Sequence, residues 1–322
     1  MPDQPRLNHF LSLGPHGFHR VAYTDWGDPA GQHIVVCVHG LTRNSRDFDE
    51  LAAHLAARGC RVVCMDVVGR GDSDWLTNKQ DYGFAQYVSD AAALLARVTA
   101  PPHRVSLLRR LQGKSEGQRV DWVGTSMGGL IGMMVAAKPN SPIRRLVLND
   151  VGPLIPWPAL ARLRLASVGE RTRFAGTDEV ERHLRETCAS FGPLRDEQWQ
   201  RLAVHGSRRG ADGSYSLALD PAIVNSMRSG GGAGVAFGSD FLLGVDVWQV
   251  WDAVTSPTLV LRGAESDLLL ESTVRRMQER GPAVKAVEFP GIGHAPWLMS
   301  RDQIDPVAGF ILAAESRETA SH

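Results

Sequence analysis

The sequence carries no surplus of charge of either sign. Its 322 residues include 35 lysines and arginines against 35 aspartates and glutamates, so the formal net charge is zero with histidine neutral. Proteins that bind nucleic acids or anionic membranes are usually attracted by an excess of positive charge. The composition therefore predicts neither a nucleic-acid partner nor a membrane partner, and it gives no reason to expect a highly charged substrate.

Cysteine is scarce in this chain. The four cysteines are Cys37, Cys60, Cys64 and Cys188, and no two of them have the C-x-x-C spacing that zinc sites use. We therefore expect no metal site. So few cysteines in a chain of this length are typical of a reduced, cytoplasmic protein.

Long apolar stretches are also lacking. No segment approaches the roughly 18 uninterrupted apolar residues of a membrane helix. The first 14 residues contain no apolar region of the kind found in signal peptides. We therefore expect a soluble protein in the cytosol.

What is present is a repeated order of strand, turn and helix. Continuous apolar runs rich in β-branched residues are typical of strands buried on both faces of a parallel sheet. They lie at residues 34–38, 61–66, 120–123, 146–148, 258–261 and 284–289. Segments with helical spacing lie between them, at residues 48–58, 84–98 and 127–137. This alternation predicts a doubly wound α/β fold, to which residues 19–25 add antiparallel edge strands joined through the turn at Gly27, Asp28 and Pro29.

Two stretches interrupt the alternation, at residues 101–119 and 153–244. The first is polar and basic, and we interpret it as a solvated helix extension and loop in preference to an arm that binds nucleic acid. The second contains helix-like pieces but no buried parallel strand. The helix-like pieces lie at residues 159–168, 178–189 and 197–204.

An insertion as long as residues 153–244 is usually functional when it lies over an active site. We therefore expect a helical lid there, inserted between two parts of one α/β core at residues 1–152 and 245–322. The glycine-rich run at residues 229–234 indicates a flexible hinge or loop.

The motif with the clearest chemistry is Gly124-Thr125-Ser126-Met127-Gly128, which matches the pattern G-x-S-x-G. It follows a predicted strand and opens a predicted helix, as the motif requires. A sharp turn there strains the central residue, and the flanking glycines remove side chains that would clash. The hydroxyl of Ser126 is then exposed at a helix N-terminus, where N–H groups favour negative charge, and we interpret Ser126 as a nucleophile.

A serine hydroxyl is a weak nucleophile at neutral pH and needs a neighbouring base. His294 is the best candidate, because it follows the last predicted strand in a glycine-rich loop from which its ring can project into a site. His39 is the alternative, although its place before the first crossover helix favours a role in shaping the backbone beside the site.

The histidine in turn needs a carboxylate that fixes its tautomer and stabilises the charged ring. Asp267 follows a predicted strand, and the chain order Ser126, Asp267, His294 agrees with the order serine, acid, histidine expected of such a fold. Asp150, which ends the preceding predicted strand, is the alternative, and Glu265 fits less well. We expect Asp267 to be the acid.

Acyl transfer also needs N–H donors for the oxyanion of the tetrahedral intermediate. The N–H of Met127, directly after the nucleophile, is one expected donor. The second is expected from the loop after the first long strand, at Leu41. Arg43 in the same loop is interpreted as part of a surface or lid salt bridge in preference to a ligand for a substrate carboxylate.

Taken together, these motifs resemble the α/β-hydrolase superfamily over nearly the whole chain, from about residue 19 to 314. The motifs are His39-Gly40, Gly69-Arg70-Gly71-Asp72-Ser73, the Ser126 elbow, the turn at Asp267 and Gly293-His294. The resemblance implies an eight-stranded, mostly parallel sheet, a lid inserted after the sixth strand, and no cofactor. Serine in place of aspartate at the elbow disfavours epoxide and carbon–halogen chemistry, and the absence of Gly-Pro-Gly after His39-Gly40 lowers the case for carbon–carbon hydrolysis.

The residues and the resemblance together predict a serine hydrolase that cleaves small or medium uncharged carboxylic esters through an acyl-enzyme. We expect Trp157, Trp199 and Trp297 to contact the substrate, because a lid packs over the active edge of the sheet. Thioesters and lactones would use the same machinery. A carbon–carbon bond hydrolase or perhydrolase, and a non-catalytic ligand-binding module of the same fold, remain as alternatives. The oligomeric state stays open, with a homodimer as one possibility.

Overall fold

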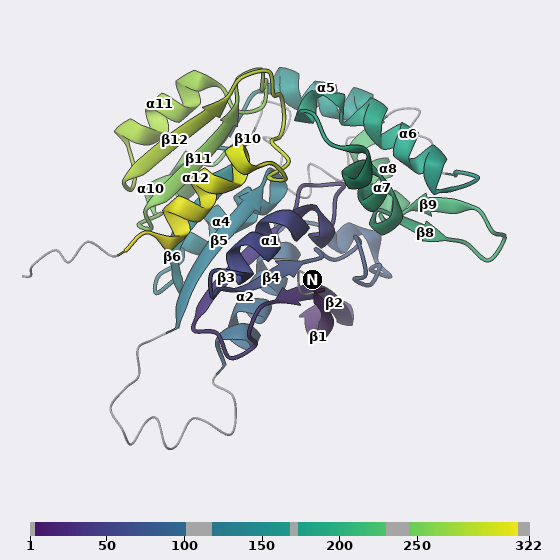
Figure 1. Cartoon of the computed structure of the whole chain (residues 1–322), viewed down its shortest axis with the longest axis horizontal. Helices are drawn as coiled ribbons and strands as arrows, with labels where there is room; N and C mark the ends of the chain where they lie inside the picture. The colour runs from purple at the N-terminus through teal and green to yellow at the C-terminus, as the bar shows by residue number, and fades with distance from the viewer. Residues whose placement is uncertain (1–3, 101–117, 168–172, 230–244, 315–322) are drawn as a thin grey trace, which may run out of the picture.

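The computed structural model describes residues 4–100, 118–167, 173–229 and 245–314, and it contains a central sheet of eight strands (Figure 1). The order of strands across the sheet is β1-β2-β4-β3-β5-β6-β11-β12. The strands are β1 (Arg6–Gly14), β2 (Gly17–Trp26), β3 (His33–Val38), β4 (Arg61–Met65), β5 (Arg119–Thr125), β6 (Ile143–Asn149), β11 (Thr258–Gly263) and β12 (Val284–Phe289). The expected doubly wound, mostly parallel sheet of eight strands is confirmed.

The six strands from β4 to β12 in this order run parallel, whereas β1 and β2 are antiparallel to their neighbours. Alternate residues of each parallel strand face opposite layers of the core. Val36 and Val38 of β3 join one apolar cluster, and Val35 and Cys37 join the other. Burial on both faces explains why β3, β4 and β11 are apolar at almost every position. β12, at the edge of the sheet, is mostly exposed, so its expected burial on both faces is corrected.

Helices cover both faces of the sheet, as the doubly wound pattern predicts. One face packs against α2 (Phe84–Thr99), α4 (Met127–Ala136), α10 (Trp248–Asp252) and α11 (Glu271–Glu279). The other face packs against α1 (Asp49–Ala56) and α12 (Arg301–Leu312). Two short 3-10 helices, η1 (Ser45–Phe48) and η2 (Lys79–Asp81), lie in loops of the core. Among the described helices, none is both long enough and apolar enough to cross a membrane.

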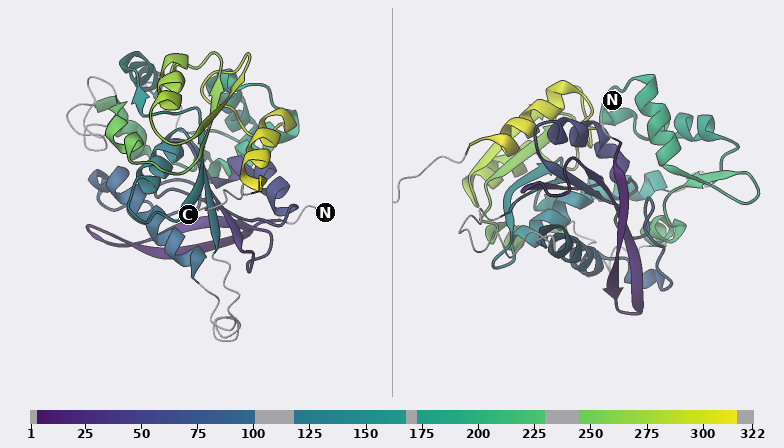
Figure 2. Two further views of the ribbon diagram at one scale, coloured as in Figure 1. Left: turned by 90° about the vertical axis from the view of Figure 1, so that its left-hand side faces the viewer. Right: turned by 60° about the horizontal axis from the view of Figure 1, so that its bottom comes forward.

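The segment between β6 and α10 is built mostly from helices, which lie together to one side of the sheet (Figures 1 and 2). Its elements are β7 (Leu154–Ile155), α5 (Trp157–Ser167), α6 (Thr177–Thr187), η3 (Ala189–Phe191), α7 (Asp196–His205), β8 (Ser207–Arg209), β9 (Tyr215–Leu217), α8 (Pro221–Ser229) and β10 (Val245–Asp246). β7 pairs with β10, so the two ends of the segment leave and rejoin the core side by side. We call residues 154–246 the inserted segment.

The predicted strands and helices agree closely with the observed ones, and the N-terminal hairpin is the main difference. The hairpin turns between Gly14 and Gly17, and the predicted turn at Gly27 instead leads from β2 to β3. β1 was not predicted as a strand because Leu7, Leu11 and Leu13 on its outer face are exposed, which obscures a half-buried pattern. The expectations for residues 101–117 and for the glycine-rich run at 230–234 lie outside the described residues.

A buried ion pair joins the hairpin to the core. Nε2 of His19 in β2 lies 3.0 Å from a carboxylate oxygen of Asp90 in α2, and both side chains are buried. This hydrogen bond raises the pKa of His19 above its ordinary value of 6.5. The folded state therefore favours protonated His19. The resulting stability is fully present below pH 6.5 and is lost as the pH rises through the raised pKa.

We predict that His19→Gln lowers the free energy of unfolding by about 2 kcal/mol at pH 5.5 and by clearly less at pH 9, because only the charged form gains from the buried pairing. Urea unfolding at the two pH values measures this difference. His16→Gln is the control, since exposed His16 makes a similar contact with Asp81 at 2.7 Å and should matter little. An equal loss at both pH values would contradict the prediction.

Candidate active site

The serine of the G-x-S-x-G motif stands on a strained turn between β5 and α4. Ser126 has φ 51° and ψ −115°, a conformation that a residue with a side chain rarely adopts. A Cβ atom at Gly128 would overlap the carbonyl of Val38, and one at Gly124 would overlap the backbone of Gly128. Only glycine fits at these two positions, which lets the turn close tightly and leaves Ser126 at its tip.

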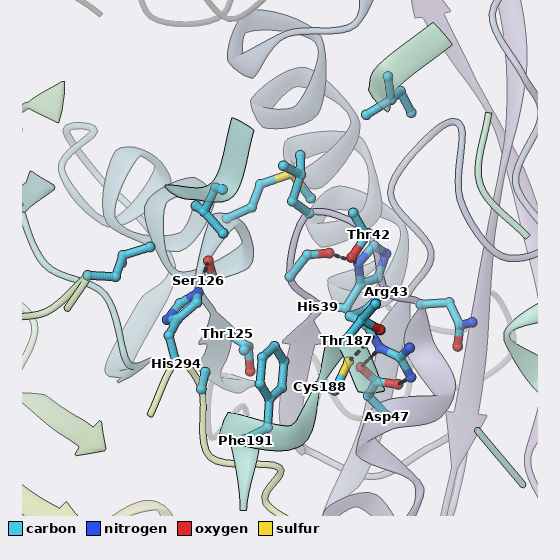
Figure 3. Close-up of a pocket in the computed structure, with 18 of the residues that line it drawn as sticks. His39, Thr42, Arg43, Asp47, Thr125, Ser126, Thr187, Cys188, Phe191 and His294 are labelled. Atoms are coloured by element: carbon cyan, nitrogen blue, oxygen red, sulfur yellow. Dashed lines mark hydrogen bonds and ion pairs between the residues drawn. The ribbon is translucent and has the colours of Figure 1, made fainter. Parts of the chain in front are cut away.

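His294 reaches this serine from the loop between β12 and α12. Its Nε2 lies 3.0 Å from Oγ of Ser126, within hydrogen-bonding distance (Figure 3). The loop is tied to the sheet because Nδ2 of Asn149, at the end of β6, donates to the carbonyl of Pro296 at 2.8 Å. The structure thus brings together the two side chains that the sequence analysis paired.

The carboxylate that meets His294 is Asp150, and the expectation of Asp267 is corrected. Nδ1 of His294 lies 2.7 Å from Oδ2 of Asp150, which is completely buried directly after β6. Asp150 also accepts a hydrogen bond from the N–H of Gly263 at 2.9 Å and one from Oγ of Ser266 at 2.6 Å. A buried carboxylate needs such donors, and here it has three.

Asp267 lies at the rim of the site and is occupied by another partner. Its two carboxylate oxygens accept hydrogen bonds from Nε and Nη2 of Arg162 in α5, at 2.6 and 2.7 Å. These bonds are the main reason that the pKa of Asp267 is lowered. The turn that was expected to provide the acid therefore supports it instead, through Gly263 and Ser266.

The two expected oxyanion donors lie beside the nucleophile. Leu41 and Met127 both line the cavity that contains Ser126. Neither N–H donates to an acceptor in the part of the chain that the structure describes, so both are available to a ligand. This arrangement agrees with the predicted role, which remains a prediction.

His39 shapes the backbone beside the site, as expected. Its Nε2 accepts a hydrogen bond from the N–H of Val67 at 3.0 Å, and its Nδ1 donates to the carbonyl of Gly40 at 2.6 Å. Burial lowers the pKa of His39 to about 3, so the ring is neutral at physiological pH. A neutral ring with this tautomer joins the loops that follow β3 and β4.

Arg70 is a further residue of the site, which was noted from the sequence only as part of the motif Gly69-Arg70-Gly71-Asp72-Ser73. Its side chain is fully buried, and its Nε donates to the carbonyl of Leu41 at 2.9 Å. Nη1 donates to the carbonyl of Val68 at 2.8 Å and to the hydroxyl of Tyr87 at 3.0 Å, while Nη2 lies 3.8 Å from Sδ of Met127. No carboxylate pairs with it among the described residues. Arg70 therefore contacts both expected oxyanion residues.

These groups open into a cavity of about 310 Å³ between the core and the inserted segment. The core provides Ser126, His294 and the loop at residues 39–44, and the inserted segment provides residues such as Leu160, His183 and Phe191. Arg43 lies in the wall, paired with Asp47 at 2.8 and 2.9 Å, on the other side of Figure 3 from His294. The predicted salt bridge of Arg43 is present, although within the core loop.

Only one of the three expected tryptophans lines the cavity. Trp297 does so, and Phe191 packs against it with ring centroids 5.1 Å apart. Trp199 lies behind Trp297, edge to face at 5.6 Å, and belongs to the apolar core of the inserted segment. Trp157 is partly exposed and lies outside the lining, so the expectations for Trp199 and Trp157 are corrected.

The described residues contain no group of three or more His, Cys, Asp or Glu side chains arranged to hold a metal ion. All four cysteines are buried, and none forms a disulfide. The groups gathered at this cavity are a hydroxyl, an imidazole, a buried carboxylate and two backbone N–H groups.

Comparison with known proteins gives consistent relatives. The sequence model of the Alpha/beta hydrolase family matches residues 35–308. A 3-hydroxybutyrate-oligomer hydrolase of Cupriavidus necator is 41% identical over 317 residues, covering 98% of this chain and 100% of that protein. A 2-(acetamidomethylene)succinate hydrolase of Mesorhizobium japonicum is 25% identical over 81% of each chain. Among solved structures, an alpha/beta hydrolase from Novosphingobium aromaticivorans is 32% identical with a TM-score of 0.73, covering 95% of this chain and 98% of its own.

The contacts of the two aspartates predict a clear difference between their variants. We expect Asp150→Asn to reduce kcat for ester hydrolysis about 10⁴-fold, because the amide favours the wrong tautomer of His294. Asp267→Asn should reduce kcat less than about tenfold, because Asp267 does not touch the imidazole. Steady-state kinetics with p-nitrophenyl butyrate measures both. A larger loss of kcat in Asp267→Asn than in Asp150→Asn would mean that Asp267 is the carboxylate that acts with His294.

The contacts of Arg70 predict an effect on turnover. Arg70→Met should lower kcat by about tenfold to hundredfold with little change in KM, because the loop that carries Leu41 loses its anchor and one oxyanion donor shifts. Arg70→Lys should recover part of the loss, since it keeps the charge near Met127. Kinetics on p-nitrophenyl butyrate, with thermal unfolding as the check on folding, tests this. A rise in KM with unchanged kcat would contradict it.

Proposed function

The chain belongs to the alpha/beta hydrolase family and hydrolyses ester bonds, and we propose that its substrates are short oligomers of 3-hydroxybutyrate. The observation that carries this proposal is the contact of Ser126, His294 and Asp150 at the wall of a cavity, in a chain similar along its whole length to a hydrolase named for such oligomers. These three side chains suit the hydrolysis of carboxylic esters, and an oligomer of 3-hydroxybutyrate contains repeated ester bonds of this kind.

In the first step, Oγ of Ser126 attacks the ester carbonyl carbon while Nε2 of His294 takes the hydroxyl proton. The contact of 3.0 Å between them places the base within reach. The carbonyl oxygen becomes an oxyanion and accepts hydrogen bonds from the N–H groups of Leu41 and Met127. Asp150 stabilises the charged ring of His294 through its contact with Nδ1.

In the second step, His294 gives its proton to the ester oxygen, and the bond from that oxygen to the acyl carbon breaks. One product leaves as an alcohol that carries a 3-hydroxybutyrate unit, and the other remains as an ester of Ser126. Water then attacks the acyl carbon with His294 as the base, and the acyl-enzyme gives a free carboxylic acid and the original serine.

The size of the cavity fits a substrate of a few units. A volume of about 310 Å³ is at the lower end of the range for ligand sites, which extends to about 1,000 Å³. The inserted segment supplies part of the wall, and we propose that it serves as the lid of this site, at about residues 153–244. A lid would limit the length of chain that lies next to Ser126 and would exclude water from the oxyanion.

We predict that the purified protein converts the dimer and trimer of 3-hydroxybutyrate to monomer, and that Ser126→Ala lowers the rate more than about 10³-fold while the fold is kept. Chromatographic measurement of the monomer follows the reaction. A fluorophosphonate probe should label the parent protein and not the variant.

Two results would contradict different parts of the proposal. Labelling of Ser126 and cleavage of p-nitrophenyl butyrate without any cleavage of the oligomers would leave a serine esterase with another substrate. No labelling of the folded parent would contradict the catalytic role of Ser126, and would favour a ligand-binding protein with the same fold.

A further inference from the structure

Two arginines line the cavity in the described part of the chain, and the pairs that they form differ in kind. Arg43 pairs with Asp47 within one loop of the core, and Arg162 of the inserted segment pairs with Asp267 of the core. Both pairs are bidentate, so each arginine already holds a carboxylate in the geometry that a substrate carboxylate would adopt.

The pair of Arg43 is enclosed. The side chains of Arg43 and Asp47 are only 10% and 13% exposed, and the guanidinium also lies over the ring of Trp297 at 5.3 Å. A substrate carboxylate at this place would add a second negative charge to a buried, neutral pair. Such a charge would remain uncompensated, which is costly in a poorly solvated site.

The pair of Arg162 is open. The side chains of Arg162 and Asp267 are 48% and 46% exposed, so either can turn into water at little cost. Asp267 can therefore leave the guanidinium when another carboxylate takes its place. Arg162 lines the same cavity as the catalytic base His294, and its bonds are the main cause of the lowered pKa of Asp267.

The proposed substrate brings a negative charge near the catalytic base when its last ester bond is cleaved. In the terminal unit that then leaves, the free carboxylate is separated from the ester oxygen by only two carbon atoms. His294 must lie next to that oxygen to protonate it. The carboxylate therefore emerges close to His294, in the cavity that Arg162 also lines, whereas Arg43 lies apart from His294 in Figure 3.

We propose that Arg162 binds the free carboxylate of the substrate in place of Asp267, so that the enzyme removes units from the carboxylate end of the chain. This inference rests on the proposed esterase chemistry. It gives Asp267 a defined role, which is to hold Arg162 in position at the rim until the substrate arrives. It also makes a free acid a better substrate than a neutral analogue of the same length.

The test uses two simple substrates that differ in charge alone, 3-(butyryloxy)butanoic acid and its amide. The measured quantity is the ratio of kcat/KM for the acid to kcat/KM for the amide. Arg162→Gln should lower this ratio about tenfold, because a bidentate contact with the carboxylate is lost. Arg162→Lys should give an intermediate ratio, since it keeps the charge but not the planar fork.

Asp267→Asn distinguishes this role from a purely structural one. Because the amide competes poorly for the guanidinium, the variant should raise the ratio by about threefold, opposite in sign to Arg162→Gln. Arg275→Gln is the matched control, since Arg275 forms an exposed pair with Glu271 outside the cavity lining, and it should leave the ratio unchanged. Thermal unfolding shows whether each variant is folded.

An unchanged ratio in Arg162→Gln would overturn the inference. Equal effects of Arg162→Gln and Asp267→Asn on both substrates would also overturn it, because they would make the pair only a latch between the inserted segment and the core. The probes are not oligomers of 3-hydroxybutyrate. Failure to cleave those oligomers would therefore contradict the proposed substrate. The acid-to-amide ratio in the Arg162 variants would still test the role of Arg162.

Discussion

The hydrogen bond between the buried carboxylate of Asp150 and Nδ1 of His294 is the contact on which the geometry of the site depends. A carboxylate with no exposed surface is tolerated only where donors surround it. The donors come from the end of β11 and from the loop after β12, so three distant parts of the chain must meet at one edge of the sheet. The parallel sheet provides this meeting point, because β6 and β11 are neighbours that end at the same edge.

The sequence was sufficient for the features that local patterns determine. Apolar runs located all six parallel strands, of which five are largely buried and β12 at the edge is mostly exposed. The elbow was also predicted, because a strained turn at Ser126 requires glycine at Gly124 and Gly128. A histidine in a glycine-rich loop after the last strand completed the pair. Each of these signals is contained within about ten consecutive residues.

The acid could not be chosen from the sequence, because both aspartates follow a parallel strand. The choice depends on where each side chain points and on what else competes for it. Asp150 adopts φ 53° and turns its carboxylate beneath His294, whereas Asp267 faces Arg162, which is 105 residues away in the chain. The prediction that Trp199 contacts the substrate was wrong for a related reason. Helical spacing shows that Trp199 is buried, but the inserted segment has an apolar core of its own, and Trp199 belongs to it.

The difference in exposure between the two aspartates also separates what each can do. Asp150 has no access to water and three donors, which hold its carboxylate in one position and suit a group that orients an imidazole. Asp267 is half exposed and is held by a single side chain of the inserted segment, so its contact can be exchanged for another carboxylate. With a net charge of zero, the chain as a whole does not attract an anion. The proposed recognition of an acidic end therefore rests on one local pair at the rim of the cavity, and the open pair is the one whose geometry permits it.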